Sequence, residues 1–277
     1  MKLKNRVALI TGAGGGFGRA IAIKMAQEGA KIGVNDVNPK GIKETLEVIR
    51  EIGGEELALE ADVGNVDQVK GMFQKVKSKW GTIDILVNNA GMVFKPEWKD
   101  YIKLHNVAVL KAVDEVMKTG KSQESMKITS SFKDEWWHVP LNVMLNGTFY
   151  CTREALKIME EKRSGKIINM ASITGEHGEP NVPAYAAAKG GIIAFTKSVA
   201  KEVIGSGIIV NAVSPGYCNT PLLNNLEEQL RAFLSAQVPL GRLGTPEEIA
   251  SLVVYLATDE ANYIVGQVFT ADGGMKI

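Results

Sequence analysis

Short apolar runs alternate with longer segments of helical period along the chain, and this alternation constrains the fold more than any other feature. The runs are rich in Val and Ile: Val7–Thr11, Lys31–Asn35, Leu57–Glu60, Ile85–Asn88, Lys166–Met170, Ile208–Val213 and Val268–Thr270. Such runs predict strands of a parallel sheet that is buried on both faces. The segments between them predict helices: Gly18–Glu28, Lys40–Ile52, Val66–Trp80, Trp137–Lys162, Ala184–Val203 and Pro246–Thr258. Repeated strand–helix units predict a doubly wound α/β fold of about seven strands, and the length of 277 residues suits one domain over 1–277.

The composition excludes several classes of protein. With 32 basic and 31 acidic side chains and 45% hydrophobic residues, the chain resembles neither a disordered segment nor a nucleic-acid or anionic-membrane binder. The two cysteines form no C-x-x-C pair and the three histidines have no ligand spacing, so we expect no disulfide scaffold and no metal site. The first apolar run is too short for a secretory signal, and no stretch suits a membrane span. We therefore expect a cytoplasmic protein with a small-molecule substrate.

One segment breaks the alternation. Between Gly91 and Asn142 lies a helical stretch, Asp100–Met117, with a broad apolar face, followed by a polar loop to Ser131. Connections this long within a compact domain are usually lids or binding elements, or are disordered. We expect the segment 92–140 to be a helical insertion after the fourth strand and to act as a substrate lid.

A glycine-rich turn follows the first strand and opens the first helix. Its residues are Gly12, Gly14, Gly15, Gly16, Phe17 and Gly18. Glycines let the backbone approach a pyrophosphate, and the helix N-terminus offers it free N–H groups and a positive dipole. Asp36 lies 18 residues after Gly18, at the end of the second run, with Val37 beside it. A carboxylate there can accept hydrogen bonds from both ribose hydroxyls of an adenosine and repels a 2′-phosphate, so we predict NAD as the cofactor.

A second group of residues suggests proton transfer to or from an alcohol or carbonyl oxygen. Tyr185 and Lys189 are four residues apart on one predicted helix and share a face. A nearby ammonium stabilises a phenolate and lowers the tyrosine pKa toward neutrality. Ser172, 13 residues before Tyr185 and just after a strand, can hold the substrate oxygen. We therefore predict Ser172, Tyr185 and Lys189 as the catalytic residues.

Together these motifs resemble the classical short-chain dehydrogenase/reductase family over essentially the whole length. The matching residues are Thr11-Gly12-x-x-x-Gly16-x-Gly18, Asp62-Val63, Asn88-Asn89-Ala90-Gly91, Ser172, Tyr185-x-x-x-Lys189, Asn211 and Ser214-Pro215-Gly216. The resemblance implies a seven-stranded Rossmann-like sheet and a homotetramer. It implies the following cofactor contacts: Asp62 and Val63 at the adenine, Asn89, Ala90 and Gly91 along the cleft, Pro215, Gly216 and Thr220 at the nicotinamide, and Lys189, with Tyr185 beside it, at the nicotinamide ribose.

The sequence departs from the family at one position. The family's catalytic asparagine belongs three residues before Gly147, where this chain has Met144. Asn142 and Asn146 flank that position but point about 200° away from it on a regular helix. A thioether lacks the donor and acceptor of an amide, so we hypothesise that the backbone carbonyl of Met144 holds a relay water beside Lys189.

The predicted function is reversible hydride transfer between NAD and a secondary alcohol or ketone, with a hydrophobic or cyclic substrate favoured by the apolar side chains of the insertion and of the segment 217–240. Met144, Trp137, Cys218 and Leu222 are the candidate pocket residues. Two alternatives remain open. One is a reductase of 3-oxoacyl thioesters, which similar chains perform, usually with NADP; Asp36 argues against it. The other is a regulator that binds NAD without turnover.

Overall fold

The computed structural model describes residues 1–92, 95, 97–122, 124–220 and 228–276. Seven parallel strands form one sheet in the order β3-β2-β1-β4-β5-β6-β7. Their bounds are β1 (Val7–Ile10), β2 (Lys31–Asp36), β3 (Glu56–Glu60), β4 (Ile85–Asn88), β5 (Gly165–Met170), β6 (Ile208–Pro215) and β7 (Val268–Ala271). Each strand corresponds to a predicted run, and the doubly wound, Rossmann-like α/β fold is confirmed.

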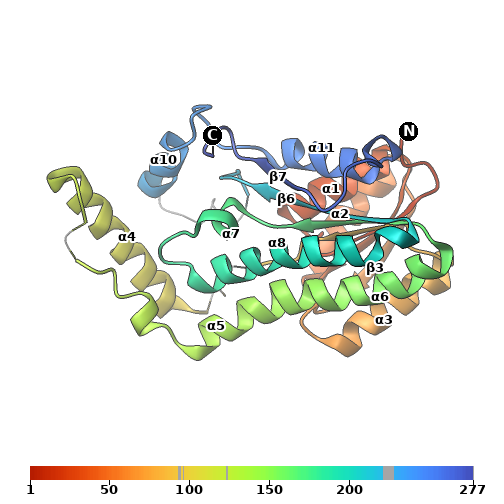
Figure 1. Cartoon of the computed structure of the whole chain (residues 1–277), viewed down its shortest axis with the longest axis horizontal. Helices are drawn as coiled ribbons and strands as arrows, with labels where there is room; N and C mark the ends of the chain where they lie inside the picture. The colour runs from red at the N-terminus through yellow and green to blue at the C-terminus, as the bar shows by residue number, and fades with distance from the viewer. Residues whose placement is uncertain (93–94, 96, 123, 221–227, 277) are drawn as a thin grey trace.

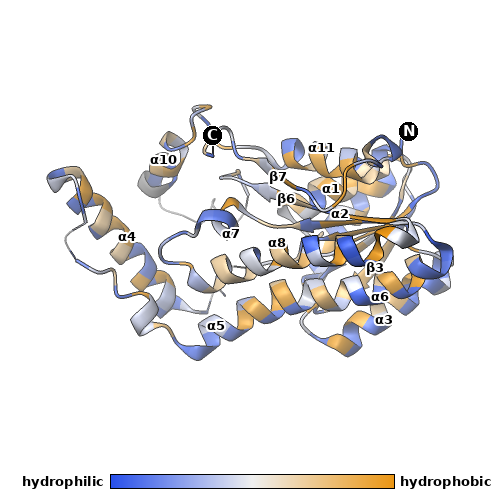
Figure 2. Ribbon diagram, viewed as in Figure 1, coloured by the Kyte–Doolittle hydropathy of each residue, from blue (hydrophilic) through white to orange (hydrophobic). Residues whose placement is uncertain are grey.

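Helices cover both faces of the sheet (Figure 1). One layer contains α1 (Gly16–Gln27), α2 (Pro39–Glu51) and α11 (Pro246–Ala257), and the other α3 (Val66–Trp80), α6 (Gly147–Lys162) and α8 (Pro183–Val203). Alternate residues of β1 enter different cores: Ala8 and Ile10 pack with the first layer, Val7 and Leu9 with the second. The central strands β1, β4 and β5 are buried on both faces, which explains why they form continuous apolar runs, and orange strand segments are visible in the sheet in Figure 2.

Local side chains set the helix starts. Asn38 and Asn65 accept hydrogen bonds from backbone N–H groups in the first turns of α2 and α3. Thr245 and Glu248 form a capping box at the start of α11, with the Glu248 carboxylate accepting from the Thr245 N–H at 2.8 Å. These caps satisfy donors that a helix end leaves unpaired.

The single helix expected over Trp137–Lys162 is wrong in detail. The structure has α5 (Asp134–Leu141), a π-helical segment η2 (Asn142–Asn146) and then α6. The extra residue in a π turn shifts the backbone register but leaves the apolar pattern nearly intact, so periodicity does not reveal it. Among the described residues outside the insertion there are also four short elements: α7 (Ile173–His177), η3 (Ile204–Ser206), α10 (Glu228–Ala236) and η4 (Asp259–Ala261).

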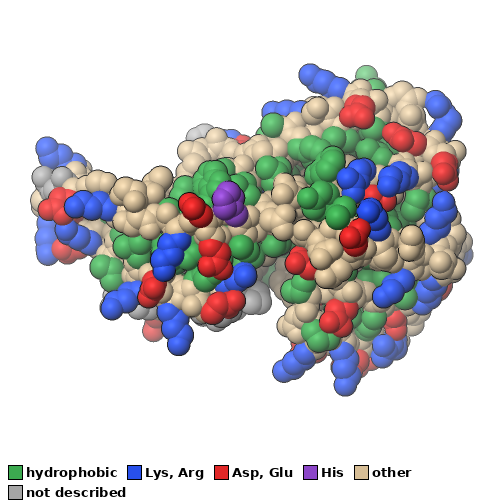
Figure 3. Space-filling model, turned by 90° about the horizontal axis from the view of Figure 1, so that it is seen from below, with side chains coloured by type: hydrophobic (Ala, Val, Ile, Leu, Met, Phe, Trp, Pro, Cys, Tyr) green, Lys and Arg blue, Asp and Glu red, His purple; other side chains and the backbone are tan. Residues whose placement is uncertain are grey.

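The insertion after β4 forms an arm that projects from the body (Figures 1 and 3). It contains α4 (Lys99–Thr119) and η1 (Thr129–Ser131), and α5 leads back to the body. Its base has a separate aromatic cluster, in which the rings of Tyr101 and Trp136 stack at 4.8 Å between centroids. The Tyr101 hydroxyl donates to the backbone carbonyl of Asn181 at 2.9 Å, which ties the arm to the loop between α7 and α8.

Neither a bilayer-spanning helix nor a cluster of three or more metal-ligating side chains occurs in the part of the chain that the structure describes. Charged side chains of both signs intermix over the surface in Figure 3, as the balanced composition leads one to expect.

Candidate active site

The structure brings Ser172, Tyr185 and Lys189 together at the carboxyl end of β5. Ser172 follows this strand and caps α7, its hydroxyl accepting from the Thr174 N–H at 3.2 Å. Tyr185 and Lys189 lie in the first two turns of α8, and the Lys189 Nζ is 5.6 Å from the centroid of the Tyr185 ring. The buried Lys189 ammonium donates to the Met170 carbonyl at 2.6 Å. The strand that presents Ser172 therefore also holds Lys189.

Two glycines set the spacing between α7 and α8. A Cβ atom on Gly175 would lie 2.5 Å from the carbonyl carbon of Lys189, and one on Gly190 would lie 3.1 Å from the Gly175 oxygen. Because no Cβ fits at the first distance, the two helices touch backbone to backbone. This contact fixes Ser172, at the start of α7, relative to Tyr185, at the start of α8.

Burial controls the protonation of this group. It raises the pKa of Tyr185, while a hydrogen bond with Ser172 acts in the opposite direction. Burial also lowers the pKa of Lys189 to about 8. Both shifts follow from desolvation, which disfavours the charged phenolate and the charged ammonium alike. Additional positive charge beside Tyr185 would favour the phenolate, so the site becomes a better base when a cation shares it.

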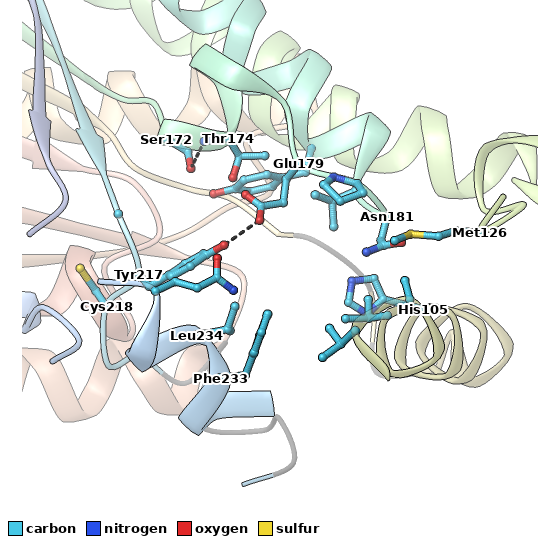
Figure 4. A pocket seen from close by; sticks show the side chains of 18 of the residues that line it. His105, Met126, Ser172, Thr174, Glu179, Asn181, Tyr217, Cys218, Phe233 and Leu234 are labelled. Atoms are coloured by element: carbon cyan, nitrogen blue, oxygen red, sulfur yellow. Dashed lines mark hydrogen bonds between the residues drawn. The ribbon is translucent and has the colours of Figure 1, made fainter. Parts of the chain in front are cut away.

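A cavity of about 480 Å³ adjoins these residues (Figure 4). Ser172 and Tyr185 form part of its wall, together with Phe17, Pro215, Gly216 and Thr220. The opposite side is supplied by α4, through His105, Val109, Ala112, Val113, Val116 and Met117. Since most of these side chains are apolar, the cavity suits a largely hydrophobic molecule.

This largely apolar wall also contains polar residues that no sequence motif had indicated. Tyr217 donates to the Oε1 atom of Glu179 at 2.6 Å, and both residues line the cavity, as does Asn181 (Figure 4). Glu179 and Asn181 lie on the loop between Ser172 and Tyr185. No motif or periodicity marks them, because their position depends on how the loop folds over the cavity.

The glycine-rich turn has the features of a phosphate-binding loop. Gly12 and Gly16 have φ angles of 63° and 51°, which favour glycine. A Cβ on Gly18 would lie 2.2 Å from the Gly12 oxygen, so the helix packs directly on the loop. Gly15 is the N-cap residue of α1 and has open space beside it. No side chain caps this helix end, and no acidic residue lies in its first turn. Its N–H groups and dipole are therefore suited to an anionic pyrophosphate.

Asp36 lies against this loop. Its carboxylate accepts from the Gly14 N–H at 2.9 Å and from the Asn38 N–H at 3.0 Å. Arg19 of α1 is a basic side chain beside the loop. Its guanidinium donates to the Gly14 carbonyl and to the Glu44 carboxylate, both at 2.6 Å. The Arg19 charge is thus already paired.

The other expected cofactor residues are ordered around the same end of the sheet. Asn89 donates through its side chain to the carbonyls of Thr11 and Gly12 at 2.9 and 3.0 Å. The Thr11 hydroxyl accepts from the N–H groups of Asn89 and Ala90, which locks the β4 end to the glycine loop. Asp62 accepts from the Gly64 N–H at 2.8 Å. Val63 is buried against Gly147 of α6, and Val37 is exposed.

The four candidate pocket residues have different positions. Cys218 lines the cavity, and burial raises its pKa to about 12, so its thiol stays protonated. Leu222 lies outside the described residues. Met144 and Trp137 do not line the cavity: Met144 is fully buried in a cluster with Ala171 and Ala188, and Trp137 is partly exposed on α5. The structure does not bring these two side chains to the cavity wall, because Trp136 is the residue of α5 that packs inward and η2 turns Met144 into the core.

The distortion of η2 does not restore an asparagine to the site. Asn142 donates to the Gly64 carbonyl at 3.1 Å, and Asn146 donates to the side-chain oxygen of Asn142 at 3.0 Å. Tyr185 instead packs against the cluster that contains Met144, and Gly91 approaches the Met144 thioether. The position beside the tyrosine is therefore apolar.

Comparison with known proteins agrees with the motifs. The family model for short chain dehydrogenase matches residues 6–231. Relatives named 3-oxoacyl-(acyl-carrier-protein) reductase occur in Thermotoga maritima, at 35% identity over 277 residues and all of both chains, and in Synechocystis, at 37% over 278 residues, 99% of this chain and 98% of the relative. A third, from Staphylococcus epidermidis, is 36% identical over 272 residues, 98% of this chain and 99% of the relative. The chain belongs to the short-chain dehydrogenase family, whose members are nicotinamide-dependent oxidoreductases.

Proposed function

We propose that the protein catalyses reversible hydride transfer between a nicotinamide cofactor and a ketone or secondary alcohol held beside Tyr185. The observation that carries this proposal is the position of Ser172 and Tyr185 in the wall of a 480 Å³ apolar cavity, with Lys189 buried behind them. A proton-exchanging pair next to a hydrophobic cavity suits carbonyl–alcohol chemistry, and it opposes a regulator that binds the cofactor without turnover.

Each residue has a distinct role in this proposal. A nicotinamide cofactor held at the glycine-rich loop and at Lys189 would supply or accept the hydride. Tyr185 donates a proton to the oxygen during reduction and removes it during oxidation, and the Ser172 hydroxyl orients that oxygen. Lys189 keeps the phenolate accessible through its charge. Its hydrogen bond to Met170 holds the ammonium in place.

For the cofactor we propose NAD. The support is the Asp36 carboxylate at the glycine loop and the pairing of Arg19 with Glu44, which together leave a 2′-phosphate facing a negative charge. Comparison of kcat/KM with NADH and with NADPH tests this, and a strong preference for NADPH would contradict it.

For the substrate, the relatives favour a 3-oxoacyl thioester, because full-length relatives at 35–37% identity have that activity in their names. A second candidate is a free ketone or alcohol with a hydrophobic or cyclic body. It is favoured by the apolar wall that α4 adds to the cavity. Turnover of 3-oxobutanoyl-N-acetylcysteamine against a panel of cyclic and linear ketones separates the two.

The Tyr185→Phe variant tests the reaction class. It should bind NADH as the unsubstituted protein does in a fluorescence titration, and it should lose turnover in both directions. Tyr255→Phe is a matched control, because Tyr255 lies on α11 and does not line the cavity. Near-normal turnover in the Tyr185 variant would overturn the assignment.

The remaining expectations are part of the same proposal. We propose that 1–277 works as one unit with 92–140 as its substrate lid, and that it forms a homotetramer in the cytoplasm. The lid is supported by the α4 residues in the cavity wall, and a reducing compartment by two free, buried cysteines. Analytical ultracentrifugation tests the tetramer.

A further inference from the structure

We propose that Glu179, Asn181 and Tyr217 form a recognition wall for a neutral hydrogen-bond donor on the substrate, a hydroxyl or an amide N–H, away from the reacting carbon. This inference rests on the proposed function, since it assigns the substrate class of the same cavity. These three residues form the acceptor wall of the cavity.

The acceptor wall contains two buried oxygens that have no donor. Glu179 uses Oε1 to accept from Tyr217, while its Oε2 atom is buried and makes no hydrogen bond. The side-chain oxygen of Asn181 is likewise buried and unpaired. Buried polar groups are nearly always hydrogen-bonded, and leaving one unpaired is unfavourable. Two such acceptors on one loop of a cavity indicate that a bound molecule supplies donors.

The charge of the side chains that line the cavity determines which kind of substrate group can bind at the acceptor wall. Among the described residues that line it, none is Lys or Arg, and Glu179 is its acidic member. Burial and the neighbouring Glu179 raise the pKa of Tyr217, so Tyr217 remains a donor to the carboxylate. A substrate carboxylate or phosphate would meet an unbalanced negative charge in an apolar setting, which is strongly unfavourable. A hydroxyl or amide N–H satisfies the free oxygen without bringing a second charge.

The acceptor wall lines the same cavity as Ser172 and Tyr185, so it can contact a substrate that is bound for reaction. Its loop residues lie between Ser172 and Tyr185 in the chain, and in Figure 4 Glu179 and Tyr217 point toward one another, with His105 of α4 on the other side. Asn181 has a φ of 80°, a left-handed conformation that asparagine tolerates better than most residues. Its backbone carbonyl accepts from Tyr101, so the arm holds this loop in position.

The test uses pairs of ketones that differ only at the far end. A series of ω-hydroxy-2-alkanones is compared with methyl-ended and carboxylate-ended ketones of equal length, so that the best reach to the acceptor wall is found rather than assumed. At that length we expect the hydroxyl to raise kcat/KM at least about tenfold over the methyl group, as for a hydrogen bond to a charged acceptor. The carboxylate should be the poorest substrate.

Variants of the acceptor wall separate recognition from folding. Glu179→Leu should bring the ratio of kcat/KM for the hydroxyl-ended ketone to that for the methyl-ended ketone down toward one, and urea unfolding checks that the variant is folded. Glu179→Gln should keep part of it, because the amide oxygen still accepts. Glu176→Gln is the matched control: Glu176 lies on α7, bonds with Thr270 and Lys276, and does not line the cavity. A preference that survives Glu179→Leu, or that is absent from the unsubstituted protein at every length, overturns the inference.

Calorimetric binding of the same ketones in the presence of NADH keeps this inference separate from the proposed function. Preferential binding of the hydroxyl-ended ketone without any turnover would support the acceptor wall and refute the reaction. Turnover of both ketones without any preference for the hydroxyl-ended one would support the reaction and refute the acceptor wall. Comparing 3-oxobutanoyl-N-acetylcysteamine with ethyl 3-oxobutanoate identifies the source of the donor: an effect of Glu179→Leu on the thioester alone assigns it to the amide N–H.

Discussion

Replacing Lys189 with methionine should make the protein more stable while abolishing turnover. Lys189 is 4% exposed, and burial lowers its pKa from 10.5 to about 8. That difference corresponds to a penalty of about 3 kcal/mol for keeping the ammonium in the folded protein at neutral pH. The variant loses the hydrogen bond to the Met170 carbonyl, worth about 1 kcal/mol. We therefore expect a net gain of about 2 kcal/mol in the free energy of unfolding at pH 7.

The gain should depend on pH in a defined direction. Between pH 8 and pH 10.5 the unfolded chain holds a proton on Lys189 that the folded protein has released, so the stability of the unsubstituted protein rises with pH across this window. Below it the penalty is fully present, and above it the penalty vanishes. The advantage of Lys189→Met should therefore be largest at pH 7 and close to zero at about pH 10.

Urea unfolding of the cofactor-free protein, at equal chain concentration and at both pH values, measures this difference. Lys197→Met is the control, because Lys197 is exposed on the same helix and should show no comparable gain. A Lys189 variant that is less stable at pH 7, or whose advantage is the same at both pH values, would refute the reasoning that burial of this charge is unfavourable.

Three further substitutions test separate parts of the structure. Asp36→Ala should lower the ratio of kcat/KM for NADH to that for NADPH by at least about tenfold, since it removes both a ribose acceptor and a repulsive charge; an unchanged ratio would contradict the NAD proposal. Met144→Asn should lower the free energy of unfolding by about 1–3 kcal/mol, because it buries an amide in the cluster of Ala171 and Ala188. The substitution should leave kcat unchanged if the backbone carbonyl of residue 144 holds the relay water. A steep rise in kcat would disprove that relay. Tyr101→Phe removes the hydrogen bond to Asn181 and should weaken the attachment of the arm by about 1 kcal/mol. In steady-state kinetics KM should rise more than kcat falls. Equal effects on KM and kcat would contradict a role of the arm in substrate binding.

The sheet and the grouping of Ser172, Tyr185 and Lys189 were predictable because they follow local rules. The seven apolar runs correspond to the seven strands, because strands inside a parallel sheet are buried on both faces and need apolar residues at consecutive positions. Tyr185 and Lys189 share a helix face by spacing alone, and Ser172 joins them because it ends a neighbouring strand.

Other parts of the site depend on contacts between distant residues. Trp136 and Trp137 are adjacent, and only the packing of the arm on Tyr101 decides which of them faces inward. Nothing in the sequence marks the π turn at Asn142–Asn146, whose side chains still suit a helix. Glu179 stands in a loop with no periodicity, and its role depends on the Tyr217 hydroxyl 38 residues later in the chain.

The contact between Gly175 and Gly190 has a consequence for anyone who searches for active residues by substitution. Neither glycine carries a functional group, yet any side chain at Gly175 pushes α7 from α8 and moves the serine away from the tyrosine. A mutational scan that scores only lost activity would rank Gly175 beside Ser172 and Tyr185. The loss would come from a displaced helix and not from a missing functional group. The separation of the reacting groups is thus inherited from two residues with no chemistry of their own.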